Sequence, residues 1–226
     1  MRRPEAVLFD FDGTLVDSAP DLAGAVNALR AEYALDPLPY ATLRGHATYG
    51  ARSLLQVGMD VSPDHPDYEL LRARFLALYD TRKLALAAPF DGVAELLTAL
   101  DAQGIRWGIV TNKHSRFALP MIDTLLVARG WRPGVVICGD STASPKPAPT
   151  PLFAAAEEIG CRTDACWYVG DGENDLLAAQ AAQMQPILAA WGYLPEAHVA
   201  EAWRVRHEAL VVEAPNKLIS LLATVD

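Results

Sequence analysis

The sequence predicts an α/β fold, a Rossmann-like doubly wound parallel sheet core with an inserted all-helical cap subdomain. The first observation is that short apolar runs alternate with helical patterns from Pro89 onward, which is typical of a parallel sheet covered by helices. The second is the segment 18–85, where helical periodicity occurs without a strand pattern. We therefore expect residues 1–17 and 86–226 to form the core and residues 18–85 to form the cap.

The composition describes a soluble globular chain. Its 226 residues can bury a full core and fit one domain with a modest insertion. The 28 acidic and 19 basic residues give a formal charge of −9, which argues against non-specific binding to nucleic acid or to an anionic membrane. No run approaches the roughly 20 apolar residues of a spanning helix. We expect a monomer or a homodimer.

The cysteine pattern predicts a reducing compartment. Cys138, Cys161 and Cys166 form neither a CxxC pair nor a zinc-binding spacing, and their number is odd. We therefore expect three free thiols and a cytoplasmic location.

The first strand is expected at 6–9, a short apolar run rich in β-forming residues and followed by Gly13. Asp10 and Asp12 come directly after it. Because side chains of an extended chain alternate, these two carboxylates leave the strand on the same side and repel each other unless a cation lies between them. Mg²⁺, a hard cation that prefers oxygen ligands, fits this position, and a solvated Asp-rich turn is the alternative.

The remaining elements are expected in the following order. Helices of the cap are predicted at 20–34, 41–45, 49–55 and 68–84, with a loop at 62–66. In the core, strands are predicted at 107–110, 135–138, 166–169, 186–190 and 209–212, and helices at 93–100, 116–128, 150–159 and 175–182.

Polar residues follow four of the predicted core strands. In a doubly wound sheet, ligands bind outside the carboxyl ends of the strands, so these positions are expected to meet at one edge. They are Asp10 with Asp12, Thr111 with Asn112, Lys146 between two prolines, and Asp171 with Asp175.

These four groups resemble the four motifs of the haloacid dehalogenase superfamily. The segment Asp10 to Ser18 reads DFDGTLVDS and is similar to the phosphatase form DxDGT[LV], and residues 170–175 resemble GDxxxD. The order and spacing of all four match along nearly the whole chain. Within this superfamily, Asp12 argues against carbon–halogen chemistry. The segment 19–22 and the triplet Thr111-Asn112-Lys113 look most like the phosphoglycolate phosphatase group.

The resemblance implies Mg²⁺-dependent hydrolysis of a small phosphate monoester through an aspartyl-phosphate. Asp10 would be the nucleophile, and Asp12 would protonate the leaving alkoxide and then deprotonate the attacking water. Lys146 would hold Asp10 and the phosphate together. Thr111 and the following backbone amides, beginning with Asn112, would bind the phosphate.

The implied metal site consists of Asp10, the backbone carbonyl of Asp12, and Asp171. Asp175 would orient a bound water or the lysine of the third motif. Gly172 departs from the pattern, because relatives often have Asp or Ser there, and its effect on metal affinity stays open.

Two further groups have alternative interpretations. Lys113 and His114 either reach the substrate or form a solvated face, and the solvated face is our expectation. Arg52 follows Gly50 in a segment that resembles a loop directed into the active site. It would pair with a substrate carboxylate, or it is a surface arginine. Arg44, His46 and Tyr49 lie in the same segment.

Several functions remain open at this point. A sugar-phosphate phosphatase, acting for instance on N-acetylmuramate 6-phosphate, would use the same core residues. A phosphomutase would also use Asp10 and Asp12 but would exclude water. A non-catalytic binding protein is the third alternative, although every catalytic position is filled.

Overall fold

The computed structural model describes residues 2–194 and 199–224 and contains a six-stranded parallel sheet in the order β5-β4-β1-β6-β7-β8. The strands are β1 (Ala6–Phe9), β4 (Arg106–Val110), β5 (Val136–Ile137), β6 (Cys166–Gly170), β7 (Gln185–Ala189) and β8 (Leu210–Val212). The core helices are α5 (Val93–Ala102), α6 (Ser115–Leu125), α7 (Thr150–Ile159), α8 (Glu173–Ala181), α9 (Val199–Arg206) and α10 (Pro215–Leu222). The predicted fold class is confirmed.

Strand β1 lies in the middle of the sheet, and its side chains alternate between two apolar layers. Val7 and Phe9 pack in the cluster that includes α5, α6 and α10, whereas Ala6 and Leu8 pack with α7 and α8 on the other face. Burial on both faces explains why this strand is an uninterrupted apolar run. It also fixes the position of Asp10, the first polar side chain after the strand.

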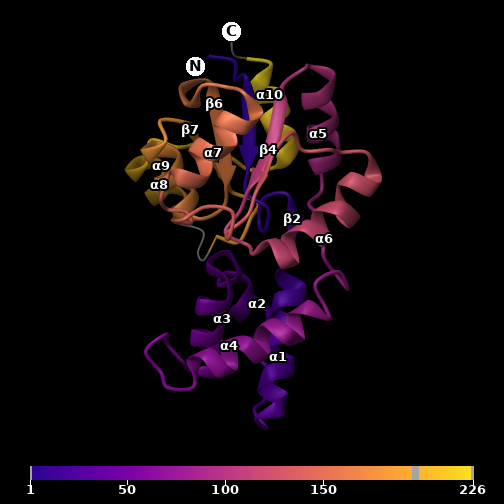
Figure 1. Ribbon diagram of the computed structural model, residues 1–226, viewed down its shortest axis with the longest axis vertical. Coiled ribbons are helices and arrows are strands. Elements are labelled where there is room, and N and C mark those ends of the chain that lie inside the picture. Colours follow the sequence, from indigo (N-terminus) through magenta and orange to yellow (C-terminus); the bar gives the residue numbers. More distant parts are fainter. Residues whose placement is uncertain (1, 195–198, 225–226) are drawn as a thin grey trace.

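Four helices lie beyond the carboxyl ends of the strands, while the start of β1 and the end of α10 lie at the opposite end of the sheet (Figure 1). They are α1 (Ala19–Glu32), α2 (Tyr40–Arg44), α3 (Gly50–Met59) and α4 (Tyr68–Asp80). The chain leaves the core through β2 (Val16–Asp17) and returns through β3 (Ala88–Pro89), and these two short strands pair antiparallel. The buried Asp21 carboxylate accepts hydrogen bonds from the Leu86 and Ala87 amides, both at 3.0 Å, and so ties the outgoing segment to the returning one.

The structure differs from the predicted elements in a few places. Helix α4 ends at Asp80, earlier than predicted, because Thr81 and Lys83 donate side-chain hydrogen bonds to carbonyls of its last turn. Helices α9 and α10 and the β2–β3 pair were not predicted. Helix α10 could have been predicted, because Pro215 at its first position is a helix-start signal.

The cysteine prediction is wrong for two of the three residues. Cys161 and Cys166 form a disulfide, whereas Cys138 is free and buried. The short 3₁₀ turn Thr163–Ala165 reverses the chain between α7 and β6 and brings the two cysteines together. A spacing of five residues resembles no redox motif, so only the turn geometry reveals the pair. Among the described residues, no helix is both long enough and apolar enough to cross a membrane.

Candidate active site

The carboxyl ends of β1, β4 and β6 bring the predicted residues together. Asp10 follows β1, Thr111 follows β4 and Asp171 follows β6, and these three strands are neighbours in the sheet. The Asp10 amide donates to the Val169 carbonyl at 2.8 Å and the Thr111 amide to the Ile137 carbonyl at 2.9 Å, so each residue is fixed by the strand beside it. Sheet topology therefore assembles residues that are far apart in the sequence.

Lys146 is the central cation of the site, with a side chain that is 2% exposed. Its Nζ lies 3.1 Å from Asp10 Oδ1 and donates to Asp175 Oδ1 at 2.7 Å, to Tyr168 Oη at 2.7 Å and to the Val110 carbonyl at 2.9 Å. Burial lowers the pKa of Lys146, but the Asp10 and Asp175 carboxylates outweigh burial and raise the pKa above its usual value. Lys146 therefore carries a fixed positive charge in an otherwise acidic site.

The backbone of Lys146 is held by Asn112. The Asn112 side-chain oxygen accepts from the Lys146 amide at 2.9 Å, and its nitrogen donates to the Lys146 carbonyl at 2.8 Å. The Asn112 side chain is thus engaged in positioning the lysine. The groups that can still donate hydrogen bonds to a phosphate here are the Asn112 backbone amide and the buried Thr111 hydroxyl.

The carboxylate of Asp10 is held by its own turn. The Phe11 amide donates to Asp10 Oδ1 at 2.7 Å. Burial raises the pKa of the Asp10 carboxyl to about 6, Lys146 opposes this increase, and the Asp175 and Asp12 carboxylates add to it. Asp10 is therefore mostly ionised at neutral pH, in an environment that disfavours its charge.

Asp171 has the chemistry of a metal ligand. It is fully buried, its Oδ2 accepts from the Tyr193 amide at 2.8 Å, and its Oδ1 has no hydrogen-bond partner among the described residues. Burial, together with the Asp10 and Asp175 carboxylates, raises the pKa of Asp171 well above its usual value. A cation at Oδ1 would remove this penalty.

Oxygen atoms of Asp10, Asp171 and Asp175 lie within 4.8 Å of one another. This buried carboxylate set fits a hard divalent cation. The chain passes so close to this set that position 13 has room only for glycine, since a Cβ atom at Gly13 would lie 2.2 Å from Asp171 Oδ2.

Gly172 lies beside Asp175 and the cap. Asp175 Oδ2 accepts from the Gly172 amide at 2.9 Å, and a Cβ atom at Gly172 would lie 2.9 Å from Thr48 Oγ1 of the cap. Gly172, the residue that departs from the fourth motif, therefore lies at the contact between the cap and the core.

Asp12 is paired with a lysine that we expected on a solvated face. Lys113 Nζ donates to Asp12 Oδ2 at 2.9 Å and to Oδ1 at 3.1 Å, and its side chain is 7% exposed. The prediction of a solvated Lys113 is therefore wrong. The Lys113 side chain extends from the end of β4 toward Asp12, and Tyr79 of the cap accepts its third hydrogen bond at 2.7 Å. These two contacts together keep the ammonium group away from solvent. His114 is 59% exposed and fits the expectation.

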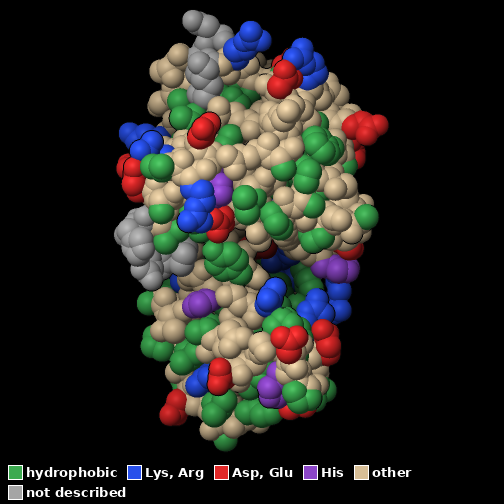
Figure 2. Space-filling model, turned by 90° about the vertical axis from the view of Figure 1, so that its left-hand side faces the viewer, with side chains coloured by type: hydrophobic (Ala, Val, Ile, Leu, Met, Phe, Trp, Pro, Cys, Tyr) green, Lys and Arg blue, Asp and Glu red, His purple; other side chains and the backbone are tan. Residues whose placement is uncertain are grey.

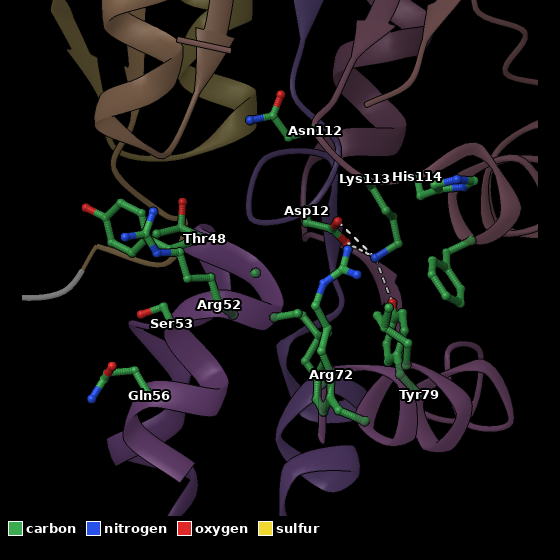
Figure 3. A pocket seen from close by; sticks show the side chains of 18 of the residues that line it. Asp12, Thr48, Arg52, Ser53, Gln56, Arg72, Tyr79, Asn112, Lys113 and His114 are labelled. Atoms are coloured by element: carbon green, nitrogen blue, oxygen red, sulfur yellow. Dashed lines mark hydrogen bonds and ion pairs between the residues drawn. The ribbon is translucent and has the colours of Figure 1, made fainter. Parts of the chain in front are cut away.

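A cavity of about 990 Å³ lies between the cap and the core. Figure 2 shows it as a hollow at mid-height, where Lys and Arg side chains gather. Asp10, Asp12 and Thr111 line its core side, and Arg52 and Arg72 line its cap side. In Figure 3 the Arg72 side chain extends from α4 toward Asp12, whereas Arg52 extends from α3 toward Thr48.

Arg72 was not predicted, because on sequence it is one of several charged residues along the exposed face of α4. Arg44 lies elsewhere, stacked over the Tyr193 ring with its guanidinium carbon 5.2 Å from the ring centre. His46 Nδ1 pairs with Ser53 Oγ at 2.8 Å, and Tyr49 lines the cavity.

The comparisons with known proteins identify the class. The model of the haloacid dehalogenase-like hydrolase family matches residues 4–183. The chain belongs to this family, and the enzyme class expected from the motifs, a phosphoric monoester hydrolase, is confirmed.

The relatives are phosphatases. The chain is 44% identical over 195 residues to a phosphoglycolate phosphatase of Xanthomonas campestris pv. campestris, with 85% of this chain and 86% of that protein covered. It is 36% identical over 221 residues to an N-acetylmuramic acid 6-phosphate phosphatase of Pseudomonas aeruginosa, with 97% and 95% covered. A crystal structure titled as a predicted phosphoglycolate phosphatase from Haemophilus somnus 129pt shares the fold, with a TM-score of 0.81, 23% identity, and 98% and 99% covered.

Proposed function

We propose that this enzyme uses Mg²⁺ to hydrolyse a small phosphate ester that also carries a carboxylate. The observation that supports the proposal most is the buried set of Asp10, Lys146 and Asp171, in which a nucleophile, a fixed cation and an unpaired carboxylate oxygen meet at one sheet edge. Phosphoryl transfer depends mainly on positioning and on neutralising charge, and this set supplies both.

In the proposed mechanism, an Asp10 oxygen attacks phosphorus, the bond to the ester oxygen breaks, and Asp12 gives its proton to the leaving alkoxide. Asp12 then takes a proton from a water molecule that attacks the aspartyl-phosphate, which releases inorganic phosphate and restores Asp10. Thr111 and the Asn112 amide bind phosphate oxygens. Lys146 offsets the charge of the nucleophile and the phosphate during both steps.

Asp10, Asp171 and the Asp12 backbone carbonyl would hold the Mg²⁺ ion. When bound, the ion neutralises negative charge on the transferred phosphoryl group. Asp175 keeps Lys146 in place and lies within the same carboxylate set. The unpaired Oδ1 of Asp171 supports a cation here independently of the family resemblance.

The cap, residues 18–85, is proposed to select the substrate. Two relatives act, by their names, on phosphoglycolate and on N-acetylmuramic acid 6-phosphate, and both of these compounds carry a carboxylate. Arg52 is our candidate for the residue that binds this carboxylate. The cavity of about 990 Å³ lies at the upper end of the usual range for ligand sites and favours the sugar phosphate as the second candidate.

A panel of phosphate esters tests the proposal. We expect phosphate release from 2-phosphoglycolate or N-acetylmuramate 6-phosphate to exceed that from carboxylate-free esters of similar size. Chelation should abolish activity and Mg²⁺ should restore it, whereas Ca²⁺ should restore it poorly because its longer bonds and higher coordination disturb in-line attack. A rearranged phosphate ester without released phosphate would favour a phosphomutase. Equal rates with both ions would contradict the metal assignment.

The proposed compartment is the cytoplasm, because small phosphate esters are multiply charged and do not cross a bilayer unaided. The proposed partner is therefore a small phosphorylated metabolite rather than nucleic acid or a membrane, and the net charge of −9 agrees with this.

A further inference from the structure

Lys113 connects the cap to the acid–base residue of the core. Its ammonium group donates three hydrogen bonds, two to the carboxylate of Asp12 and one to the hydroxyl of Tyr79 (Figure 3). The Tyr79 side chain belongs to α4 of the cap, and Asp12 belongs to the turn after β1. All three donor positions of the ammonium group are therefore used by a core residue and a cap residue together.

Tyr79 is firmly placed between the cap and the core. It is 1% exposed and lies in the last turn of α4. Its ring packs edge-on against Phe117 of α6 with ring centres 5.5 Å apart, and its hydroxyl donates to the sulfur of Met121 at 3.4 Å. Burial raises the pKa of Tyr79 to about 12. The hydroxyl consequently stays protonated, donates to Met121, and accepts from Lys113.

Asp12 is held from two sides. Lys113 contacts both of its carboxylate oxygens, and the hydroxyl of Ser18 donates to Oδ1. Ser18 is the N-cap position of α1, where the chain enters the cap. Both groups that hold the carboxylate of Asp12 therefore depend on how the cap is seated on the core.

We propose that Tyr79 is a positioning residue that holds Lys113, and through it the carboxylate of Asp12, in the geometry required for proton transfer. The inference rests on the proposed acid–base role of Asp12. Proton transfer requires a distance close to that of a hydrogen bond, so a carboxylate that can rotate freely loses part of its rate advantage. The contact between Tyr79 and Lys113 thus links the cap to the acid–base residue, beside the direct contact from Ser18.

The test uses the leaving group. An alkoxide needs a proton as it departs, whereas p-nitrophenolate is a stable anion and needs none. The value of kcat/KM reports the steps through formation of the phosphoenzyme, where the leaving group departs. Loss of positioning at Asp12 should therefore lower kcat/KM for an alkyl phosphate more than for p-nitrophenyl phosphate. A purely structural defect would lower both values alike.

Five variants, one of them a control, are compared on p-nitrophenyl phosphate and on the alkyl phosphate that the wild-type enzyme hydrolyses fastest. We expect Tyr79→Phe, which keeps the ring, to lower kcat/KM about 10-fold on the alkyl ester and less than about 3-fold on the aryl ester. Lys113→Met should lower the alkyl value about 30-fold or more. In the double variant, Tyr79→Phe should cause no further loss, because its effect passes through Lys113.

Asp12→Asn separates this inference from the proposed function. If Asp12→Asn spares the aryl ester and Tyr79→Phe does not, only the positioning role of Tyr79 is wrong. If Asp12→Asn itself lowers both esters alike, the acid–base assignment falls and the positioning role falls with it. Additive losses in the double variant would also overturn the proposal. Tyr33→Phe, at a tyrosine that is 51% exposed at the end of α1, is the matched control and should leave both rates unchanged.

Discussion

The two walls of the cavity are built differently. On the core wall, the Asp10 side chain is 14% exposed, and behind it lies the Lys146–Asp175 ion pair, whose side chains are 2% and 4% exposed. On the cap wall, Arg52 is exposed, and Arg72 is 46% exposed and forms an ion pair with Glu69 at 3.6 Å. The charged groups on the core side are held by fixed partners, whereas the two arginines on the cap side are exposed and can change rotamer.

This difference matches a division of work between chemistry and selection. Groups that stabilise a transition state act best when they need no reorganisation, which requires burial and fixed partners. Groups that select among substrates can remain solvated until a ligand arrives and desolvates them. The comparison predicts that core variants affect all substrates and that cap variants affect some of them.

The largest expected effect comes from the core wall. Asp10→Asn removes the proposed nucleophile and keeps the shape, so we expect turnover of every ester in the panel to fall by at least about 10⁴-fold. The circular dichroism spectrum and cooperative unfolding should be retained. Measurable hydrolysis of even one ester at a near wild-type rate would show that the aspartyl-phosphate route is not the one used.

The second effect sharpens the contrast on the cap wall. Arg52→Ala should lower kcat/KM for a carboxylate-bearing ester by roughly 30- to 1000-fold, the cost of one buried charged hydrogen bond, and should hardly change the value for p-nitrophenyl phosphate. Arg72 points toward Asp12, so Arg72→Ala should lower both values, by about 10-fold.

Arg74 provides the control for these two substitutions. It lies on the same helix as Arg72 but pairs with Glu32, so Arg74→Ala should leave both values unchanged. If Arg52→Ala lowers the values for both esters equally, Arg52 supports the structure or the phosphate, and the specificity assignment is wrong.

Most of the core could be predicted from sequence, because all six strands of its sheet and four of its helices have local signals. The strand before Asp10 is an apolar run bounded by a turn, and buried parallel strands require such runs on both faces. The disulfide and the β2–β3 pair could not be predicted, since they depend on turns that bring separate segments together. Helices α9 and α10 were also not predicted, although Pro215 at the first position of α10 is a helix-start signal.

The catalytic motifs placed Asp10, Thr111, Lys146 and Asp171 at one edge, and the structure brings them together there. Sequence reasoning failed for Lys113, whose burial depends on Tyr79, a residue 34 positions away on the cap. No local pattern reports a contact between subdomains. The residues that couple the cap to the chemistry are therefore the ones that required a structure.

The smallest expected effect tests whether the rigid core wall reduces stability. The pKa of Asp10 is raised to about 6, so its ionised form is disfavoured in the folded protein, and stability that is present below pH 4 is lost as pH rises through 6. Asp10→Asn cannot ionise. With metal chelated, we expect its free energy of unfolding at pH 8 to exceed that of the wild type by on the order of 1 to 3 kcal/mol, and the difference to shrink toward pH 4.

Denaturant unfolding at several pH values measures this difference in unfolding free energy, with Asp123→Asn, at an exposed position, as the control. A variant less stable than the wild type at pH 8 would mean that the Asp10–Lys146 ion pair outweighs the cost of burial, and that catalytic preorganisation in this enzyme also stabilises the fold.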